Sequence, residues 1–210
     1  MRKPLLIYGA GGLGREVMSL IKALGDHWDP IGFIDDTIAK NTTVGGLQVV
    51  GGRESLNAFE NGISVALAIG DPKLKRSIAE KIVGRIEFAT LIHPSAILQD
   101  PDSISIGQGA IITAGCILTC NIRLGDHVLV NINSTIGHDV SVGRCSSIMP
   151  GVNVAGEVAI GEAILIGSGS NILNRIHIGD EARIGMGSVV IRDVAQGDTV
   201  AGVPAKSILR

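Results

Sequence analysis

The stretch from Leu124 to Val142, Leu-Gly-Asp-His-Val-Leu-Val-Asn-Ile-Asn-Ser-Thr-Ile-Gly-His-Asp-Val-Ser-Val, places an aliphatic residue at every sixth position. The spacing continues in both directions, and all fifteen positions are aliphatic: Ile106, Ile112, Leu118, Leu124, Val130, Ile136, Val142, Ile148, Val154, Ile160, Ile166, Ile172, Ile178, Ile184 and Val190. Six is not a helical period. It returns to one face of a strand, because strand side chains alternate with a period of two. The repeat therefore predicts short strands that share one aliphatic face.

The other positions of the hexad indicate how these strands connect. The fifth residue is small or aliphatic from Ala110 to Val194, and glycine takes the second position at 107, 125, 137, 143, 161, 167, 179 and 185. Glycine permits bends where a side chain would obstruct the chain. Strand and bend in repetition wrap the chain into a prism with three hexads in each triangular coil, so fifteen hexads predict five coils. An ordinary antiparallel β protein would keep this spacing only by chance.

Composition supports a core built from aliphatic layers. Of the 210 residues, 45% are hydrophobic and only 2% are aromatic, and the net charge is -2. Without a basic run there is no electrostatic footprint for nucleic acid or an anionic membrane. Three cysteines without a C-x-x-C pair argue against a disulfide framework or a zinc site. The sequence shows no signal peptide and no apolar run of about 18 residues, so we expect a cytoplasmic protein.

The segment ahead of the repeat alternates strand and helix patterns. Strands are predicted at 4–8, 31–35 and 65–69, with a helix ending near residue 24 and another over about 72–84. This alternation indicates a small parallel α/β sheet. We therefore predict a Rossmann-like domain over residues 1–92 and a β-helix over residues 93–210.

A glycine fingerprint follows the first predicted strand. Gly9, Gly11 and Gly14 fit G-x-G-x-x-G at the start of a helix, and Asp35 lies about 20 residues further on. Backbone N–H groups at such a helix start bind a pyrophosphate, which NAD and nucleotide sugars both contain. A segment of roughly 90 residues is short for the usual six-stranded dinucleotide fold. A nucleotide or sugar head group is therefore favoured over NAD, and a purely structural turn stays open.

The whole chain resembles the hexapeptide-repeat acyltransferases, whose coil is left-handed. Within that superfamily it is similar to the branch with a small Rossmann-like domain, which includes nucleotide-amino-sugar N-acetyltransferases and sialic acid O-acetyltransferases. The resemblance rests on the repeat and on the motifs at residues 8–14, 33–36, 68–71, 91–94, 185–190 and 201–206. It implies acetyl-CoA as co-substrate and a nucleotide-linked sugar as partner. It also implies sugar contacts by the equivalents of Gly11, Gly12, Leu13, Asp35, Asp36 and Gly70. The family commonly has histidine where this chain has Leu13, so the sugar and its nucleotide stay open.

Acyl transfer from a thioester needs a base for the acceptor and a donor for the oxyanion. Histidine is the usual base, and His138 stands at the third position of a hexad, off the lined interior and after Gly137. The resemblance implies that His138 is the base and that Asp139 raises its basicity. An exposed histidine on a coil face is the alternative. His93 is expected to be structural, and His127, His177 and His27 are expected to lie in solvent.

Further site residues come from the resemblance alone. It implies that Asn131 lies near the acceptor and that Ser147, Gly156 and Met186 contact acetyl-CoA, with the Gly156 N–H as the oxyanion donor. Lys206 in the tail could meet the CoA phosphates, or be a solvated lysine. Cys145 as a nucleophile is disfavoured, because nothing near it in the sequence lowers its pKa.

The resemblance also implies a homotrimer with sites shared between subunits. Apolar residues off the lined interior, such as Ile132, Met149 and Leu173, would be buried between prisms. His138 would then meet CoA bound by Gly156 of the adjacent chain.

Three other functions compete with nucleotide-amino-sugar N-acetylation. O-acetylation of a sialic acid or related sugar is the nearest. A zinc lyase needs three converging histidines, and Gly143 stands where a partner of His138 would be expected. A non-catalytic β-helix assembly protein would show no acetyl-CoA turnover.

Overall fold

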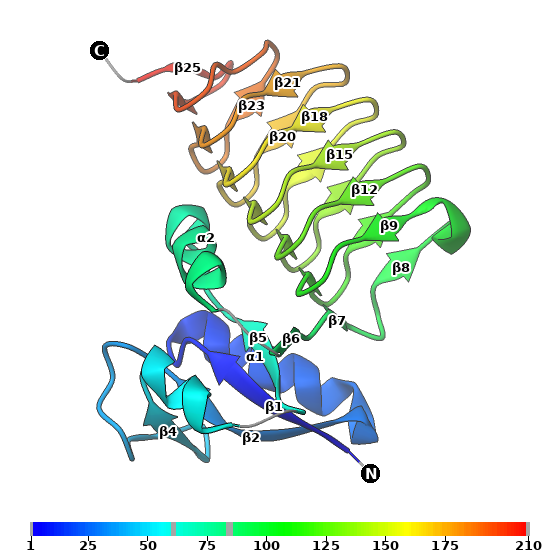
Figure 1. The fold of residues 1–210 in the computed structure, drawn as a ribbon. Helices are drawn as coiled ribbons and strands as arrows, with labels where there is room; N and C mark the ends of the chain where they lie inside the picture. The colour runs from blue at the N-terminus through cyan, green and yellow to red at the C-terminus, as the bar shows by residue number, and fades with distance from the viewer. Residues whose placement is uncertain (1, 60–61, 83–85, 209–210) are drawn as a thin grey trace.

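A computed structural model describes residues 2–59, 62–82 and 86–208, and it has two parts, a small α/β domain and a three-sided prism (Figure 1). The domain contains one sheet in the order β3-β4-β2-β1-β5-β6. Its strands are parallel except for the β3–β4 hairpin. The strands are β1 (Lys3–Tyr8), β2 (Trp28–Ile34), β3 (Thr43–Val44), β4 (Leu47–Gly51), β5 (Ser64–Leu67) and β6 (Glu87–Phe88).

The helices of this domain begin where the sequence predicted. Helix α1 (Gly12–Ala23) follows the glycine fingerprint, and short 3-10 helices span Gly25–His27 and Arg53–Ala58. Helix α2 (Pro72–Lys81) starts after Asp71, whose side chain caps it by accepting from Leu74 N at 2.9 Å. Proline at the first helical position removes a donor that would have no partner. The prediction extended α2 to 84, and 83–85 lie outside the described residues.

The prism is a left-handed β-helix with three faces, each a sheet of parallel strands apart from the antiparallel β25 (Figure 1). Face 1 contains β7 (Leu91–Ile92), β10 (Ile111–Ile112), β13 (Leu129–Val130), β16 (Ser147–Ile148), β19 (Leu165–Ile166), β22 (Arg183–Ile184), β24 (Thr199–Ala201) and the antiparallel β25 (Lys206–Ser207). Face 2 contains β8 (Ile97–Leu98), β11 (Ile117–Leu118), β14 (Thr135–Ile136), β17 (Asn153–Val154), β20 (Asn171–Ile172) and β23 (Val189–Val190). Face 3 contains β9 (Ser105–Ile106), β12 (Arg123–Leu124), β15 (Ser141–Val142), β18 (Ala159–Ile160) and β21 (His177–Ile178).

The hexad pattern explains the interior of the prism. The first residues of the hexads from Ile112 onward are buried, and so are the fifth residues. Three of the buried serines at the fifth position, Ser134, Ser146 and Ser170, donate to carbonyls of the next turn. The fourth position has a left-handed backbone even where it is not glycine, at Asn121, His127, Asn133, Asp139, Cys145, Glu157, Ala163, Arg175 and Glu181. The corners from Gly109 to Gly187 are therefore left-handed turns.

The prism begins earlier than the repeat in the sequence. Strands β7 and β8 precede Ile106 and form the first coil together with β9, which contains it; each of the three pairs with a strand one coil later. The 3-10 turn at Pro101–Ser103 lengthens this coil by two residues and interrupts the six-residue period. The expected five coils are therefore one too few. The division of the chain after residue 92 stays a prediction, and β7 at that point already pairs with β10.

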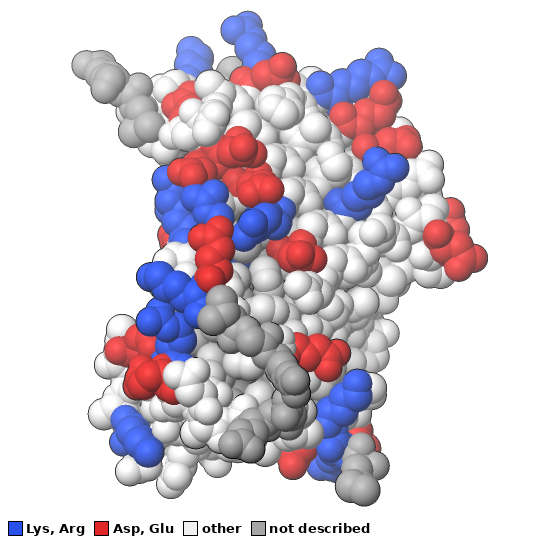
Figure 2. All heavy atoms as spheres, in the orientation of Figure 1, with Lys and Arg blue, Asp and Glu red and all other residues white. Residues whose placement is uncertain are grey.

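The α/β domain packs on face 1. Helix α1 shares a buried cluster with Leu91, Ile111 and Leu129 of that face, and Met149 packs against the same cluster. Met149 is half-buried, so its own chain covers it in part, and its burial between prisms stays a prediction. Figure 2 shows acidic and basic side chains intermixed where α2 meets the coils. They include Arg183 with Asp71 at 2.9 Å and Lys73 with Glu181 at 2.8 Å.

No helix within the described residues is both long enough and apolar enough to cross a bilayer.

Candidate active site

His138 lies at the turn between β14 and β15, at the corner between faces 2 and 3. Its side chain is 56% exposed, and its Nδ1 lies 2.7 Å from Oδ2 of Asp139. An ionised carboxylate only accepts hydrogen bonds, so the proton of the neutral ring sits on Nδ1. The lone pair of Nε2 is then free to take a proton. This arrangement suits a general base.

Asp139 is held in the orientation that this pairing needs. Its left-handed backbone turns the carboxylate back toward the ring of His138, and Asn121 Nδ2 donates to its Oδ1 at 3.2 Å. The hydrogen bonds from His138 and then from Asn121 lower the pKa of Asp139 below its ordinary value. Asp139 therefore stays ionised when His138 acts.

Gly156 lies one coil above His138 in the same chain. A Cβ built on Gly156 would overlap Nε2 and the adjoining carbons of the imidazole. Within the described part of the chain, the N–H of Gly156 donates to no protein acceptor. The coil repeat therefore brings His138 and Gly156 together within one chain. Contact between His138 and CoA bound by an adjacent chain stays a prediction. The free N–H beside the base has the location that an oxyanion donor needs.

The glycine fingerprint forms a loop between β1 and α1. A Cβ on Gly14 would overlap the carbonyl oxygen of Gly9, whereas Cβ atoms on Gly11 and Gly12 would meet open space. Helix α1 has no side-chain cap and no acidic residue in its first turn. Its first N–H groups and its positive dipole end are therefore available to an anion such as a pyrophosphate.

Asp35 and Asp36 line the same edge of the sheet but already hold protein donors. Asp35 accepts from Ala10 N at 2.8 Å and from three donors of Thr37 and Ile38 between 2.7 and 3.0 Å. Asp36 accepts from Tyr8 Oη at 2.5 Å and from Arg53 N at 2.7 Å. The structure thus gives both carboxylates a role in shaping the loop. Their contact with a ligand stays a prediction.

Leu13 and Gly70 lie together beside this loop. A Cβ on Gly70 would come within 4.0 Å of a methyl group of Leu13. Leu13 is half-buried and packs against the α1 cluster. The polar group that the resembling family has at this position is therefore replaced by an apolar contact.

Two more predicted residues lie at the corner between faces 1 and 2. Asn131 follows β13 and is 3% exposed, whereas Met186 follows β22 and is 77% exposed. Asp71, next to Gly70, bonds to Arg183 of β22, so the glycine loop and Met186 are on one side of the prism. Lys206 is exposed in β25 near the end of the prism. Its contact with CoA phosphates stays a prediction.

Ser147 has a different environment from the one expected. It is completely buried, and its Oγ accepts a hydrogen bond of 2.9 Å from Lys75 Nζ of α2. This location, under the α/β domain on face 1, argues against contact with acetyl-CoA. No pattern in the sequence indicates that α2 covers this strand.

The other histidines are dispersed. His127, expected in solvent, is buried edge-on against Phe88 with ring centroids 4.5 Å apart. Burial lowers its pKa to about 4. His93 lines a hollow beside α1, and His27 and His177 are exposed. Among the described residues, no three His, Cys, Asp or Glu side chains gather as a metal site would require.

The predicted site residues therefore form two groups. His138, Asp139 and Gly156 lie at the corner opposite face 1, which carries the α/β domain. The glycine loop, Asn131 and Met186 lie on the domain side. A ligand on the glycine loop of one chain is separated from His138 of that chain by the prism itself.

Known proteins share this architecture over the whole chain. A family model described as the PglD N-terminal domain matches residues 4–82. GDP-perosamine N-acetyltransferase of Escherichia coli O157:H7 is 32% identical over 156 residues, covering 71% of this chain and 69% of that protein. The acetyltransferase domain of PglB from Neisseria gonorrhoeae FA1090, solved with acetyl coenzyme A, matches with a TM-score of 0.90 and 30% identity, covering 99% of this chain and 100% of that one.

The chain belongs to the hexapeptide-repeat acetyltransferases. A further member, PerB from Caulobacter crescentus, was solved with CoA and GDP-perosamine. It matches this acetyltransferase with a TM-score of 0.87 and 28% identity, covering 97% of this chain and 96% of that one. The predicted fold, a Rossmann-like domain followed by a left-handed β-helix, is confirmed.

Proposed function

We propose that this acetyltransferase moves the acetyl group of acetyl-CoA to the amino group of a nucleotide-linked amino sugar, with His138 as general base. One observation carries the proposal. The free Nε2 of His138 lies directly beside Gly156, whose N–H has no protein acceptor among the described residues. Base and oxyanion donor are thus adjacent, as acyl transfer requires.

In the proposed reaction the acceptor nitrogen attacks the thioester carbonyl carbon. Nε2 of His138 takes a proton from that nitrogen, and the Gly156 N–H donates to the carbonyl oxygen as its negative charge develops. The C–S bond then breaks, the proton passes to the CoA sulfur, and the amide is released. The carboxylate of Asp139 stabilises the imidazolium between these two transfers.

The acceptor is assigned from both halves of the chain. The uncapped start of α1 suits the pyrophosphate of a nucleotide sugar. Among the named relatives, one is a GDP-perosamine N-acetyltransferase, and another was solved with CoA and GDP-perosamine. These points favour an amino acceptor over the hydroxyl of a sialic acid, and an enzyme over an assembly protein.

A homotrimer is part of the proposal because one chain holds the two groups of site residues on separate corners. Both corners bound face 2. If face 2 of three chains points to a common axis, the His138 corner of one chain meets the Asn131 corner of the next. Face 2 and its corners also carry exposed apolar side chains, which association would cover: Ile97, Ile132, Leu173, Met186 and Ile191.

A cytoplasmic location also belongs to the proposal. Acetyl-CoA and nucleotide sugars are cytoplasmic metabolites, and the three cysteines are unpaired.

The function is tested by ligand-dependent melting and by turnover. UDP-, GDP-, CMP- and dTDP-linked sugars, including GDP-perosamine, are screened for a rise in melting temperature, which a ligand of the folded state produces by mass action. Acetyl-CoA turnover is then measured with each ligand that binds. Gly12→Val, which fills open space at the loop, should weaken acceptor binding and leave acetyl-CoA affinity intact. Tight NAD binding, or no acetyl transfer to any bound amino sugar, would overturn the proposal.

A further inference from the structure

A hollow of about 220 Å³ lies between α1 and the corner that joins faces 1 and 2. Its apolar wall comes from Leu20 and Ala23 of α1 with Ala114 and Ile132 of the prism. Its other lining residues are polar: Glu16, Ser19, His93, Thr113 and Asn131. Pockets that enclose a drug-sized ligand measure about 300–1,000 Å³. This hollow therefore suits a single ring and not a whole nucleotide sugar.

Asn131 presents hydrogen-bond donors to this hollow. Its Oδ1 accepts from Ile132 N at 2.8 Å and from Thr113 Oγ1 at 3.2 Å. These two donors fix the orientation of the amide. Its Nδ2 is then left without a protein acceptor in the described residues, on a side chain that is 3% exposed. This amide nitrogen is therefore available to donate to a ligand in the hollow that Asn131 lines.

His93 presents a second neutral donor. Its Nδ1 accepts from the backbone N–H of Ser95 at 3.1 Å. A neutral imidazole that accepts at Nδ1 carries its proton on Nε2, so the free ring nitrogen donates. Neutral donors from Asn131 and His93 can orient ring oxygens, but they do not distinguish an amino group from a hydroxyl.

Glu16 is the only acidic residue among the described residues that line the hollow. It is exposed on α1, between the glycine loop and the helix centre. Asn131 and His138 follow successive strands of one coil, β13 and β14. In the proposed trimer, the neighbour's base would therefore reach the hollow at the height of Asn131.

We propose that Glu16 is a specificity residue that recognises the cationic amino group of the acceptor sugar. The inference rests on the proposed function and deepens it. A sugar amine binds as an ammonium ion, and a carboxylate at the rim of a partly apolar hollow forms a charge-assisted hydrogen bond with it. The ammonium loses one proton to solvent before attack and the second to His138 during attack. The amide product is neutral and loses the ion pair, so Glu16 favours substrate over product.

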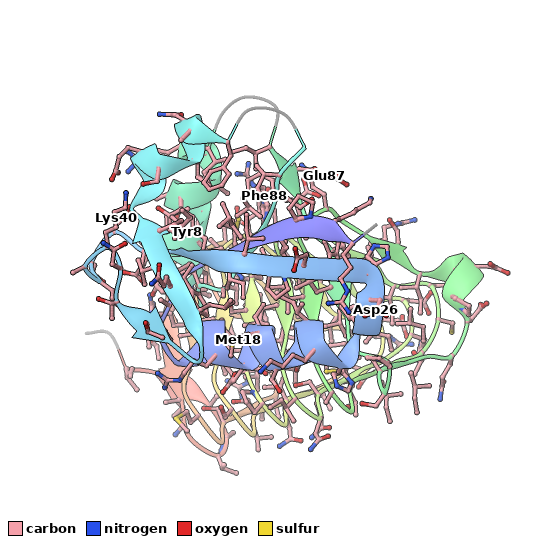
Figure 3. The ribbon with its side chains drawn as sticks, turned by 90° about the horizontal axis from the view of Figure 1, so that it is seen from below. Tyr8, Met18, Asp26, Lys40, Glu87 and Phe88 are labelled. Carbon is pink, nitrogen blue, oxygen red and sulfur yellow. The ribbon has the colours of Figure 1, made fainter. Side chains whose placement is uncertain are left out.

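The test compares two acceptors on three proteins by calorimetry without acetyl-CoA. The acceptors are GDP-perosamine and the matching GDP-sugar with a hydroxyl in place of the amino group. The proteins are the wild type, Glu16→Gln and the charge-matched control Glu87→Gln. Glu87 lies on β6. Strands β1 and β2 separate it from Met18 of helix α1, the helix that carries Glu16 (Figure 3).

Glu16→Gln should raise the Kd of GDP-perosamine about tenfold or more, the usual value of a hydrogen bond to a charged group. The Kd of the hydroxyl counterpart should change less than about twofold, and Glu87→Gln should change neither. An equal loss for both sugars, or no loss for the amino sugar, overturns the role of Glu16 and leaves the proposed function standing. If the wild type binds neither sugar, the inference fails for GDP-perosamine, whereas the proposed function fails only if no bound nucleotide-linked amino sugar is acetylated.

Discussion

The imidazole of His138 occupies the space that a side chain on Gly156 would need, one coil further along the prism. Gly156→Ala should therefore displace the ring while keeping the peptide N–H. Because a general base must stay within hydrogen-bond reach of its proton, kcat should fall roughly tenfold to 100-fold. Steady-state kinetics with a melting curve checks this. Unchanged kcat would show that the ring need not lie where it does.

His138→Ala should lower turnover by roughly 100-fold or more, the usual contribution of a general base, with little change in melting. Asp139→Asn tests the tautomer separately. An asparagine amide can donate to Nδ1, which would place the ring proton on Nε2 and block the base. We expect at least about a tenfold loss of kcat with KM for acetyl-CoA unchanged. Normal turnover in either variant would remove the residue from its assigned role.

The shared site is tested by mixing inactive chains. A His138→Ala chain and a Gly12→Val chain are defective at different corners. After subunit exchange, random trimers should regain up to about a quarter of wild-type activity, the fraction of interfaces that pair two intact halves. Activity of the mixture and light scattering provide the measurement.

The matched control for that mixture is His138→Ala with Gly156→Trp. Both changes lie at the corner that holds His138 and Gly156. Every chain in this mixture therefore has a defective His138 corner, and every interface contains one. Chains of these two kinds should not complement each other. Recovery in the control, or none in the main mixture despite verified exchange, would contradict sites shared in this way.

Lys75 gives stability a pH dependence. Its side chain is 1% exposed, and burial lowers its pKa from 10.5 to about 7, although Cys145 and Asp71 oppose the shift. Between about pH 7 and 9 the unfolded chain binds the extra proton. The free energy of unfolding should therefore rise with pH, by up to about 1.4 kcal/mol per pH unit. Burial also raises the pKa of the Cys145 thiol above 9.0, which opposes the rise only at higher pH.

Denaturant unfolding at several pH values checks this slope. Lys75→Met should flatten it, because the titrating group is gone, whereas Lys81→Met at the exposed end of the same helix should retain it. An equal slope in Lys75→Met would assign the effect to other groups.

The repeat made most of the fold predictable, because each hexad specifies one short strand and one turn without contacts to distant residues. The first coil escaped notice, since the longer turn at Pro101–Ser103 breaks the period between Leu98 and Ile106. The burial of His127 was also missed. Its hexad position normally faces outward, and only the docking of Phe88 covers it.

Contacts between residues that are adjacent in sequence or one coil apart could be predicted, because the repeat fixes their spacing. The His138–Asp139 contact is of the first kind, and the catalytic role of the pair stays a prediction. Ser147 was misplaced because helix α2 packs on it from another domain. For the same reason Glu16 drew no attention, and His93 was expected to be structural. The hollow that they line forms only when α1 docks on face 1.

Docking of the α/β domain on face 1 also fixes the position of His138 along the prism axis relative to the glycine loop. Adjacent coils are about 4.8 Å apart, and Asn131 lies in the same coil as His138. Duplication of one coil between these two residues would repeat every hexad contact and leave each half-site chemically unchanged. It would nevertheless move His138 by one coil, about 4.8 Å along the prism, away from the docked domain and out of reach of a proton transfer. The number of coils between the docked domain and His138 thus determines activity as much as the side chains do. A gain or loss of whole coils would inactivate the enzyme without unfolding it.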